Sequence, residues 1–484
     1  MNVCVVGTGY VGLVTGTCLA YLGRSVTCVD IDERKIEMLR GGQSPIYEPG
    51  LDGLITSGMQ RGNLRFTTDI DEAVKSAEVI FIAVGTPPLP SGKANLSFVE
   101  TVARQIGRSL DLTNRRIVVN KSTVPIGSGN WVEMLVKEGL HDNPLYQEKL
   151  ASAAAGNGGS VSKLSGSRKL TGLKAEDLFL VASNPEFLRE GSAIGDTFYP
   201  DRIVIGASDN YAAERLRALY QPIIEQTFAA PSSVARPSGF TAVPVVTTDL
   251  ASAEMIKYAA NAFLATKISF ANEVANICER VGADITEVVR GFGLDSRIGP
   301  KFLNAGIGWG GSCFGKDVSA LLDIAREYHY EPEILTATIS VNARQRHIAV
   351  QKLQEHLKII KGKTIGLLGL AFKPETDDLR DAPALDIARQ LLANGARVKA
   401  YDPIAMEACQ KQYADLKIEY AADETALADD CDALVIVTEW EQFRHVNLEK
   451  LGEVMRQKFI VDGRNILDPE AVKRAGFVYR GVGR

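Results

Sequence analysis

The chain has 484 residues, a net charge of −5 at pH 7 and seven cysteines. Its length is too great for one hydrophobic core and predicts about three units. The net charge argues against nucleic acid or an anionic membrane surface as the main partner, and the lack of an apolar run of about 18 residues predicts no membrane span. The cysteines are scattered without a C-x-x-C pair, so we expect neither a disulfide framework nor a metal site.

Short apolar runs alternate with amphipathic helical patterns through the first half of the chain, starting at the N-terminus without a basic leader. The runs have the composition of strands buried on both faces of a parallel sheet, and they cover residues 3–6, 25–29, 79–83, 116–120, 178–182 and 203–205. Helical patterns over 11–22 and 33–39 lie between them. The alternation predicts a doubly wound α/β domain, and the N-terminal run favours a cytoplasmic protein over one with a signal peptide.

Two segments interrupt this alternation. Residues 151–174 are rich in Ala, Gly and Ser, and residues 229–244 are dense in Pro, Ser and Ala. We interpret both as surface insertions or mobile loops without a chemical role.

A long helix is expected over residues 249–281, which contain neither Pro nor Gly and carry apolar residues at three and four spacing. A second long helical pattern runs from Pro332 to about residue 360, after which apolar runs return at 363–370, 397–401, 433–437 and 459–461. The sequence thus predicts two Rossmann-like doubly wound α/β domains joined by a long central helix. We place the NAD-binding domain at 1–247, a central helical segment at 248–330 and a second α/β domain at 331–484.

A dinucleotide site is predicted near the N-terminus, where Gly7-Thr8-Gly9-Tyr10-Val11-Gly12 follows a strand and opens a helix. Gly7 permits the tight turn, Gly9 lets backbone N–H groups approach a pyrophosphate, and Gly12 allows close helix–sheet packing. Asp30 ends the next strand, where a carboxylate accepts from ribose hydroxyls and repels a 2′-phosphate, so NAD is favoured over NADP. Asp32 competes for this role but lies past the strand end, and a glycine turn without a ligand is the alternative.

Two further loops follow apolar strands, Gly85-Thr86-Pro87 and Lys121-Ser122-Thr123-Val124-Pro125. Loops at the carboxyl ends of parallel strands line the ligand crevice of such folds. Thr86 and Thr123 are therefore candidate cofactor or water contacts, and helix N-caps are the alternative.

Paired carboxylates follow the next strand, in Asn184-Pro185-Glu186-Phe187-Leu188-Arg189-Glu190-Gly191. If Pro185 starts a helix, Glu186 and Glu190 lie four residues apart on one face. They would repel unless a substrate, a cation or a proton relieves them, and a solvated helix face is the alternative.

A cation and an amide occupy neighbouring turns of the expected long helix, at Lys257 and Asn261. Among apolar neighbours they suggest groups aimed into a cleft, with a snorkelling lysine as the alternative. Further on, Gly306–Asp317 sets Cys313 in a glycine-rich turn close to Lys316 and Asp317. A nearby cation or backbone N–H groups stabilise a thiolate, so Cys313 is a candidate nucleophile; a buried structural cysteine is the alternative.

Taken together, these motifs resemble those of the UDP-glucose/GDP-mannose dehydrogenase family. The matching segments follow the family order over nearly the whole chain and are 7–12, 121–125, 185–190, 257 with 261, 295–299, 302–306, 309–317, and 372–373 with 380. The resemblance implies an N-terminal NAD domain, a central helix that builds a homodimer or higher homo-oligomer, and a C-terminal domain that binds the UDP moiety.

The resemblance also implies a four-electron reaction in which UDP-glucose, two NAD⁺ and water give UDP-glucuronate and two NADH. It assigns Cys313 the attack on an aldehyde intermediate, which forms a thiohemiacetal and then a thioester. Lys257 with Asp317 resembles the catalytic pair of the first oxidation. Asn261 with Lys257 would stabilise the oxyanion, and water oriented by Asp317, Glu186 or Thr123 would hydrolyse the thioester.

Binding roles carry over from the same resemblance. The implied cofactor-binding residues are Gly7, Gly9, Tyr10, Val11, Gly12, Asp30, Lys35, Thr86, Thr123, Glu190, Lys316 and Arg380. The implied substrate-binding residues are Glu186, Phe187, Leu188, Arg189, Glu190, Lys257, Asn261, Arg297, Phe302, Leu303, Asn304, Ala305, Gly306, Gly310, Cys313 and Lys373.

Three other functions compete with this interpretation. A sister enzyme would act on GDP-mannose or a UDP-N-acetylhexosamine, although the run from Ser312 to Asp317 resembles the UDP-glucose branch more. A non-catalytic nucleotide-sugar-binding protein would have the same fold. A cysteine hydrolase would need a histidine partner, and none of the five histidines lies in a recognisable motif beside Cys313.

Overall fold

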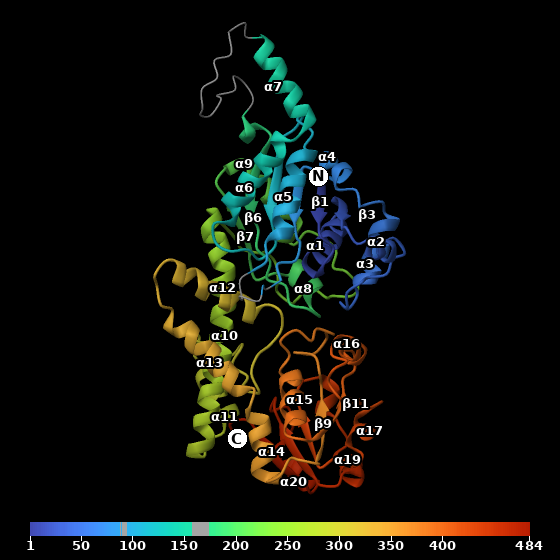
Figure 1. Cartoon of the computed structure of the whole chain (residues 1–484), viewed down its shortest axis with the longest axis vertical. Coiled ribbons are helices and arrows are strands. Elements are labelled where there is room, and N and C mark those ends of the chain that lie inside the picture. The colour runs from blue at the N-terminus through green and yellow to red at the C-terminus, as the bar shows by residue number, and fades with distance from the viewer. Residues whose placement is uncertain (88, 90–93, 157–173) are drawn as a thin grey trace. The chain divides into compact units, whose positions relative to one another are not determined.

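The structure is a computed structural model that describes residues 1–87, 89, 94–156 and 174–484. Most of the insertion predicted at 151–174 lies outside the described residues. The chain divides into two compact units, Met1–Lys257 (unit 1) and Tyr258–Arg484 (unit 2). Figure 1 shows the elements of both in chain order.

Unit 1 is built on an eight-stranded sheet in the order β3-β2-β1-β4-β5-β6-β7-β8. The strands are β1 (Asn2–Val6), β2 (Ser25–Val29), β3 (Leu64–Thr67), β4 (Val79–Ile82), β5 (Arg116–Asn120), β6 (Phe179–Ser183), β7 (Ile203–Ala207) and β8 (Val245–Thr248). The first six are parallel in the order typical of dinucleotide-binding folds, while β7 runs antiparallel to β6. The helices are α1 (Tyr10–Tyr21), α2 (Glu33–Arg40), α3 (Leu51–Gln60), α4 (Ile70–Ser76), α5 (Ser97–Ser109), α6 (Ser128–His141), α7 (Pro144–Gly156), α8 (Ala193–Phe198) and α9 (Asn210–Ile224), with a short 3₁₀ turn at Ala175–Asp177.

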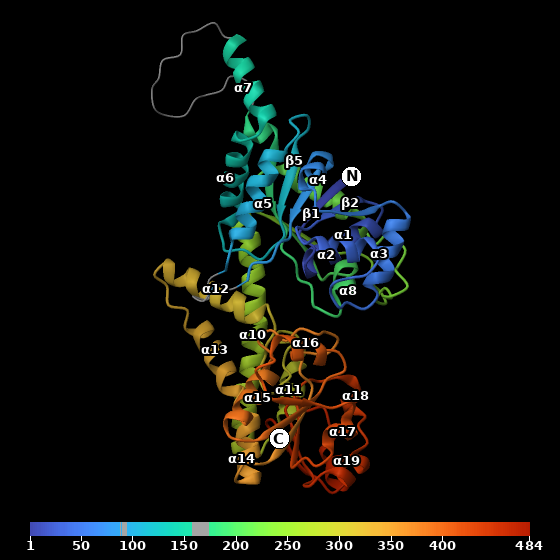
Figure 2. The same cartoon turned by 45° about the vertical axis from the view of Figure 1, so that its right-hand side comes forward.

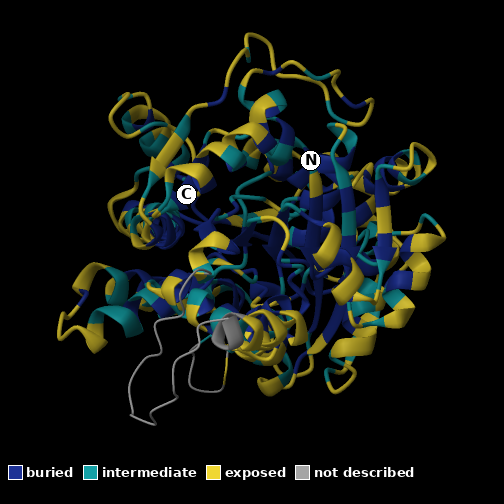
Figure 3. Cartoon of the chain, turned by 90° about the horizontal axis from the view of Figure 1, so that it is seen from above, coloured by how far each residue is buried: buried dark blue, intermediate teal, exposed yellow. Residues whose placement is uncertain are grey.

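Helices bury both faces of this sheet, which explains why its strands are continuous apolar runs. Val3 and Val5 of β1 join one core with Leu13 of α1, whereas Cys4 and Val6 join a second core with helices α4, α5 and α6. Figure 3 shows the strands in dark blue and the outward helix faces in yellow. Successive strand residues point to opposite faces, so both sets must be apolar.

The predicted strands of unit 1 are confirmed, and two more are present. The sequence did not predict β3 and β8, because neither is a continuous apolar run. Buried and exposed residues alternate in β3, and most of β8 is accessible to solvent. The insertion predicted at 229–244 has no helix or strand, but it is packed. Val243 is buried, and the ring of Phe240 meets that of Tyr199 edge-on at 5.8 Å.

The predicted long helix is α10 (Leu250–Val281), which runs from unit 1 into unit 2. Asp249 stabilises its first turn, because its carboxylate accepts from the backbone N–H of Ser252 at 2.8 Å. The helix ends at Gly282, which has a φ of +76°, and the N–H of Ala283 returns to the carbonyl of Cys278. This is the glycine termination expected of a helix C-terminus.

Unit 2 repeats the strand order of unit 1 in a six-stranded parallel sheet, β11-β10-β9-β12-β13-β14. Its strands are β9 (Thr364–Leu368), β10 (Arg397–Tyr401), β11 (Ile418–Tyr420), β12 (Ala433–Ile436), β13 (Phe459–Asp462) and β14 (Val478–Gly481). Its helices after α10 are α11 (Ile285–Gly293), α12 (Phe314–Glu327), α13 (Glu333–Gln345), α14 (Ile348–Leu357), α15 (Pro383–Ala393), α16 (Met406–Gln412), α17 (Glu424–Ala428), α18 (Glu441–Arg444), α19 (Leu448–Val454) and α20 (Pro469–Arg474). The predicted α/β fold with two Rossmann-like sheets and a helical middle is confirmed.

The single helix predicted from Pro332 to residue 360 is wrong, because the segment forms α13 and α14 (Figure 2). The break falls at Arg346 and His347. The carbonyl of Arg346 accepts from the side chain of Gln390, and the N–H of His347 bonds to the carbonyl three residues earlier. These tertiary and turn hydrogen bonds replace the helical ladder, which the sequence pattern does not reveal.

The two sheets share a turn and an acid but use the acid differently. Gly7 after β1 and Gly369 after β9 both have a φ of +103°, and Asp30 and Asp402 follow the next strand in each unit. Asp402 is completely buried. Its carboxylate accepts from the Trp440 indole and from four backbone N–H groups, those of residues 370, 371, 404 and 405. Asp402 therefore closes its own loop and has little capacity left for a ligand.

Replacing Asp402 with Ala removes this shared acceptor and leaves five buried donors without a partner. We expect the free energy of unfolding to fall by about 3 kcal/mol or more. Chemical denaturation of the full chain, followed by circular dichroism, measures the loss. Asp423→Ala is the control, because Asp423 caps α17 at the surface and its loss should cost about 1 kcal/mol. Equal losses in the two variants would contradict the assigned role of Asp402.

Candidate active site

The turn after β1 has the shape that a dinucleotide requires. A Cβ added to Gly7 would lie 2.7 Å from the carbonyl oxygen of Ala83, and one added to Gly12 would lie 2.0 Å from that of Gly7. A Cβ added to Gly9 meets no described atom within 4 Å, and no described side chain caps the start of α1. The helix N-terminus is therefore accessible to a pyrophosphate.

Asp30 is held ionised beside this turn. Its carboxylate accepts from the N–H and hydroxyl of Thr8, at 2.8 and 2.7 Å, and from the N–H of Asp32 at 3.0 Å. Burial alone would raise the pKa of Asp30, but the hydrogen bonds from Asp32 and Thr8, with the charge of Lys35, hold that pKa below its usual range. Asp32 caps α2 by accepting from the N–H of Arg34. The residues present fit NAD, with Asp30 in the better position for the ribose.

A buried glutamate that the sequence interpretation missed ties the glycine turn to the loop after β6. Glu48 accepts from the N–H of Gly191 at 2.7 Å, from the N–H of Ile194 at 3.2 Å and from the hydroxyl of Tyr10. Burial, and then Glu48, raise the pKa of Tyr10 above its usual value. Glu48 lies in an irregular segment outside any motif, so no sequence signal marked it.

The loops after β4 and β5 are joined by a hydrogen bond of 2.9 Å from the hydroxyl of Thr86 to the carbonyl of Thr123. Neither threonine caps a helix, because the N-cap of α5 is Leu96 and that of α6 is Gly127. The N-cap alternative is therefore wrong for both.

Glu186 and Lys257 form a buried ion pair, with 3.0 Å between Oε1 and Nζ and side chains 7% and 5% exposed. Burial opposes ionisation, yet the charge of Lys257, the N–H of Leu188 and the charge of Lys121 together hold the pKa of Glu186 below its usual value. The snorkelling alternative for Lys257 is wrong. The ring of Phe187 lies 5.3 Å from the Lys257 ammonium and 3.5 Å from the guanidinium of Arg202.

The helix expected from Pro185 is also wrong, because α8 starts only at Ala193. The N–H of Leu188 donates to the carboxylate of Glu186 at 2.6 Å, and the N–H of Arg189 donates to Asp196 at 2.8 Å. Side chains thus take the place of helical carbonyls. Glu186 consequently faces Lys257 instead of sharing a helix face with Glu190.

Lys121 is a second buried cation in unit 1, and it was not among the predicted site residues. Its ammonium donates to Oδ1 of Asn184 at 2.9 Å and to the hydroxyl of Tyr220 at 3.5 Å. Burial lowers the pKa of Lys121 to about 8; Glu186 opposes the shift and Lys257 adds to it.

In unit 2, Cys313 occupies the N-cap position of α12 and is exposed, whereas the other six cysteines are buried. Its Sγ lies 3.6 Å from the hydroxyl of Ser312. The buried structural alternative is wrong for Cys313.

Asp317 is one turn further along α12 and is 1% exposed. Its carboxylate accepts from the amide of Asn261 at 2.6 Å and from the ammonium of Lys316 at 2.7 Å. Asn261, on α10, is itself buried. The structure therefore places a buried carboxylate and a cation on the first turn of the helix that Cys313 starts, and an amide from α10 donates to that carboxylate.

Three residues at the end of α13 hold the backbone of the cysteine loop. Asn342 accepts from the N–H of Trp309 and donates to its carbonyl, Arg346 donates to the same carbonyl at 2.8 Å, and Gln345 donates to the carbonyl of Gly306 at 2.7 Å. None of the three was predicted, because polar residues on an amphipathic helix have no distinctive spacing.

The other predicted substrate residues of unit 2 lie in loops. Leu303 and Ala305 are buried, and Phe302 has a φ of +64°. A Cβ added to Gly310 would lie 2.2 Å from the carbonyl oxygen of Asp381. The charged members are Arg297, paired with Asp295, and Lys373, whose ammonium lies over the ring of Phe372. Arg380, a predicted cofactor residue, is paired with Asp378.

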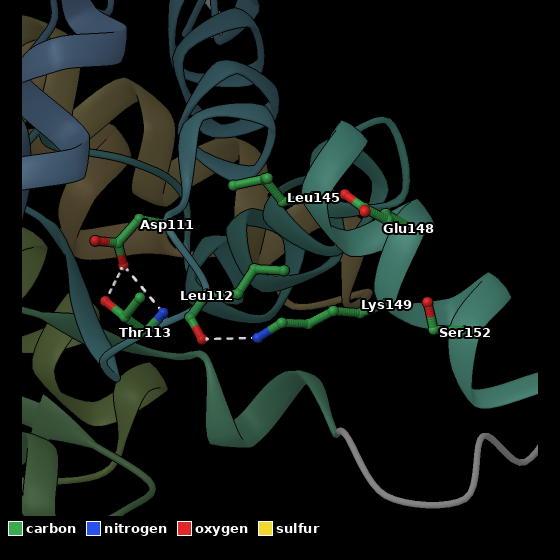
Figure 4. A pocket seen from close by; sticks show the side chains of 7 residues that line it. All are labelled: Asp111, Leu112, Thr113, Leu145, Glu148, Lys149 and Ser152. Atoms are coloured by element: carbon green, nitrogen blue, oxygen red, sulfur yellow. Dashed lines mark hydrogen bonds between the residues drawn. The ribbon is translucent and has the colours of Figure 1, made fainter. Parts of the chain in front are cut away.

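A surface pocket in unit 1, lined by none of these residues, lies between the loop before β5 and α7 (Figure 4). Lys149 donates to the carbonyl of Leu112 at its edge. Its lining residues are Asp111, Leu112, Thr113, Leu145, Glu148, Lys149 and Ser152. Within the described ranges, no helix has the length and apolarity to cross a membrane, and no His, Cys, Asp and Glu cluster is suited to a metal.

A glycine turn that opens a helix and an acid after the next strand are typical of the dinucleotide-binding domain of a dehydrogenase. Residues 1–224, 251–344 and 366–469 match, in order, the NAD binding, central and UDP binding domains of the UDP-glucose/GDP-mannose dehydrogenase family. The chain belongs to this family and is an NAD-dependent oxidoreductase, as predicted.

Individual relatives match over the whole chain. It is 45% identical over 483 residues to the UDP-glucose 6-dehydrogenase TuaD of Bacillus subtilis, covering 100% of this chain and 93% of that protein. A solved UDP-glucose dehydrogenase from Pyrobaculum islandicum matches with a TM-score of 0.82 and 38% identity, over 100% of this chain and 97% of the other. A UDP-D-ManNAc dehydrogenase from Pyrococcus horikoshii matches with a TM-score of 0.79 and 27% identity, over 100% and 99%.

The buried ammonium of Lys121 predicts a pH dependence of stability. Below pH 8 both the folded and the unfolded chain hold this proton, whereas between about pH 8 and 10.5 only the unfolded chain does, so stability contributed by this site rises with pH. The free energy of unfolding of the native protein minus that of Lys121→Met should therefore rise by up to about 3 kcal/mol across this range. Denaturant titrations at several pH values measure it. A constant difference would contradict the burial of a charged lysine.

Proposed function

We propose that the protein is a UDP-glucose 6-dehydrogenase that oxidises UDP-glucose to UDP-glucuronate through a covalent adduct on Cys313. The observation that carries the proposal is the exposed Cys313 at the start of α12, one turn before the buried carboxylate of Asp317. The higher identities to enzymes named for UDP-glucose, 45% and 38% against 27% for the UDP-D-ManNAc enzyme, favour this substrate over those of sister enzymes.

NAD, when bound, supplies an electrophilic nicotinamide that accepts hydride. Gly9 and the start of α1 bind its pyrophosphate, and Asp30 accepts from its ribose hydroxyls. The remaining predicted cofactor and substrate residues keep their assigned roles as part of the proposal.

Oxidation of the C6 alcohol requires that a proton leave the hydroxyl oxygen and that a hydride leave C6. Lys257, whose ammonium is paired with Glu186, and Asp317, paired with Asn261 and Lys316, are the groups that exchange this proton, directly or through water. The product of this step is an aldehyde.

The aldehyde needs a nucleophile before it gives up a second hydride. The thiolate of Cys313 forms the S–C6 bond while the carbonyl electrons move to oxygen, and Asn261 with Lys257 stabilises that oxyanion. Loss of the second hydride leaves a thioester. Water, oriented by Asp317, Glu186 or Thr123, adds to the thioester, the C6–S bond breaks, and the carboxylate and the free thiol are released.

The N-terminus of α12 supports this role, because the backbone N–H groups of a first helical turn favour negative charge on the sulfur that starts the helix. We also propose a cytoplasmic location, with which seven cysteines free of disulfide bonds accord.

We also propose that α10 forms a homodimer interface. Phe263, Phe270 and Ile277 are spaced by seven residues and are 66%, 54% and 53% exposed, and Val281 is 70% exposed. Large apolar side chains at this spacing form the seam of paired helices.

The yield of NADH per UDP-glucose tests the proposed reaction. We expect two NADH per sugar nucleotide consumed, and no comparable rate with GDP-mannose or UDP-N-acetylhexosamines. In Cys313→Ser, steady NADH formation should fall on the order of 10³-fold or more, because a serine ester would form and hydrolyse poorly. One NADH per sugar, or unchanged turnover in the variant, would refute covalent catalysis. NADH from GDP-mannose but not from UDP-glucose would reassign the substrate.

Replacing Asp30 with Ala should raise the Kd for NAD about tenfold and reduce discrimination against NADP, because charge-assisted hydrogen bonds to the ribose are lost. Calorimetric titration with both nucleotides measures these affinities. Asp32→Ala is the matched control and should change nucleotide preference little, since Asp32 caps α2. A larger effect at Asp32 would move the ribose role to that residue.

Charges placed on the exposed seam of α10 should dissociate the dimer. The double variant Phe263→Glu, Ile277→Glu should have the mass of one chain in size-exclusion chromatography with light scattering at micromolar concentration, because buried carboxylates are strongly disfavoured in an apolar seam. The control Ile334→Glu alters an equally exposed apolar residue of α13 and should leave the native mass unchanged. The same result for both variants would rule out α10 as the interface.

A further inference from the structure

Lys121 carries a buried charge for which the reaction as proposed above has no use. Its side chain is 8% exposed, and its ammonium bonds to the neutral side chains of Asn184 and Tyr220 at 2.9 and 3.5 Å. It also lies 6.0 and 5.8 Å from the ring centroids of Phe81 and Tyr220. Within the described part of the chain, no carboxylate lies within 4.0 Å of it.

Such an arrangement is unfavourable unless the charge acts on something nearby. An ammonium removed from water loses its hydration free energy. Hydrogen bonds to neutral acceptors compensate for only part of that loss. A neutral side chain of similar length would fill the same space at lower cost. Buried charges of this kind are concentrated at functional sites.

The groups on which Lys121 acts are the members of the buried ion pair. The charge of Lys121 is attracted by that of Glu186 and repelled by that of Lys257. Glu186 and Lys257 both lie within unit 1. Glu186 therefore responds to two lysines, one in direct contact and one at longer range. Because electrostatic coupling is mutual, the repulsion that disfavours the proton on Lys121 also disfavours the proton on Lys257.

The covalent connections strengthen this coupling. Asn184, which accepts from Lys121, is two residues before Glu186 and is itself fixed by a 2.7 Å bond from its amide to the carbonyl of Val204. The hydroxyl of Tyr220, on α9, donates to the same Oδ1 at 2.7 Å. Lys121 thus fixes the segment that carries Glu186 by a hydrogen bond and also places a positive charge near that carboxylate.

We propose that Lys121 is a positioning residue that keeps Glu186 ionised and favours loss of a proton from Lys257 to water, so that the neutral amine can accept the C6 hydroxyl proton in the first oxidation. The proposal rests on the function proposed above. When Lys257 gives up its proton, its ion pair with Glu186 loses one charge. The ammonium of Lys121 then remains to balance the carboxylate, so that the proton leaves the pair instead of moving to Glu186.

The pH dependence of kcat at saturating UDP-glucose and NAD⁺ tests the proposal. In Lys121→Met, the ionisation assigned to the Lys257–Glu186 pair should move to higher pH by about one pH unit, because a neighbouring positive charge is lost. The KM for UDP-glucose should stay within about twofold of the native value, and Lys121→Arg should restore the native profile. A kcat lowered by the same factor at every pH, or an unmoved profile, would overturn the proposal.

Asn184→Asp provides a second variant that keeps the side-chain shape. It places a carboxylate on Lys121 and neutralises its charge, so the ionisation should again move to higher pH. Lys411→Met, which removes an exposed lysine paired with Glu407 in unit 2, is the control and should not move the profile. An unmoved profile in Asn184→Asp would count against the proposal even if Lys121→Met does not fold.

A measurement without activity separates this proposal from the substrate assignment. Apparent Tm values of Lys121→Met, Glu186→Gln and the double variant form a double-mutant cycle at pH 7. We expect the change in Tm caused by Lys121→Met to be more favourable, by several degrees, in the Glu186→Gln background than in the native one, because the lysine there has already lost its favourable partner. Additive changes would overturn the coupling. If UDP-glucose gives no NADH with the native protein, the function fails while the cycle still decides the coupling.

Discussion

The buried ion pair between Glu186 and Lys257 constrains the loop that follows β6 in the first sheet. Two charges removed from water are stable only when their other hydrogen-bonding groups are satisfied. Here the N–H of Leu188 donates to the second carboxylate oxygen of Glu186. This bond replaces a helical hydrogen bond in the segment after β6. The pair also joins the last turn of α10 in unit 1 to the loop after β6. Glu186 and Lys257 are therefore buried at a high cost in desolvation free energy.

The two sheets show how one topology supports two tasks. Both place a positive-φ glycine after the first strand and an acid after the second. In unit 1 the acid, Asp30, accepts from Thr8 and Asp32 at an open turn, whereas in unit 2 Asp402 is buried under five donors. The same residue type at the same topological position lies beside an open turn in one case and closes its own loop in the other. Fold alone does not decide between them.

The cysteine loop shows a comparable division between chemistry and support. Cys313 and Asp317 lie on one turn of α12, but the backbone that leads to them is held by Asn342, Gln345 and Arg346 of α13. Reactive groups need a fixed geometry to which their own side chains contribute little. The side chain of Arg346, at the break between α13 and α14, also donates to Asp381 and Asp386.

The sequence by itself determined the features that arise from local chemistry and periodicity. Apolar runs predicted the inner strands, the absence of Pro and Gly predicted α10, and the glycine turn with Asp30 predicted the NAD site. These signals are local because a strand buried on both faces, an uninterrupted helix and a tight turn each require particular residues in direct succession. The turn around Cys313 made it only a candidate nucleophile, and the resemblance over the rest of the chain favoured that role over a structural one.

Only the tertiary structure decided what buried polar side chains do. Glu48, Lys121 and the polar end of α13 were not predicted, and Glu186 was expected on a helix that does not form. The physical reason is that the free energy of a buried polar group depends on its partners, and those partners are distant in the chain. Glu186 meets Lys257 across 71 positions, and Lys121 meets Asn184 across 63. Residue spacing carries no record of such pairs, so the fold had to bring them together first.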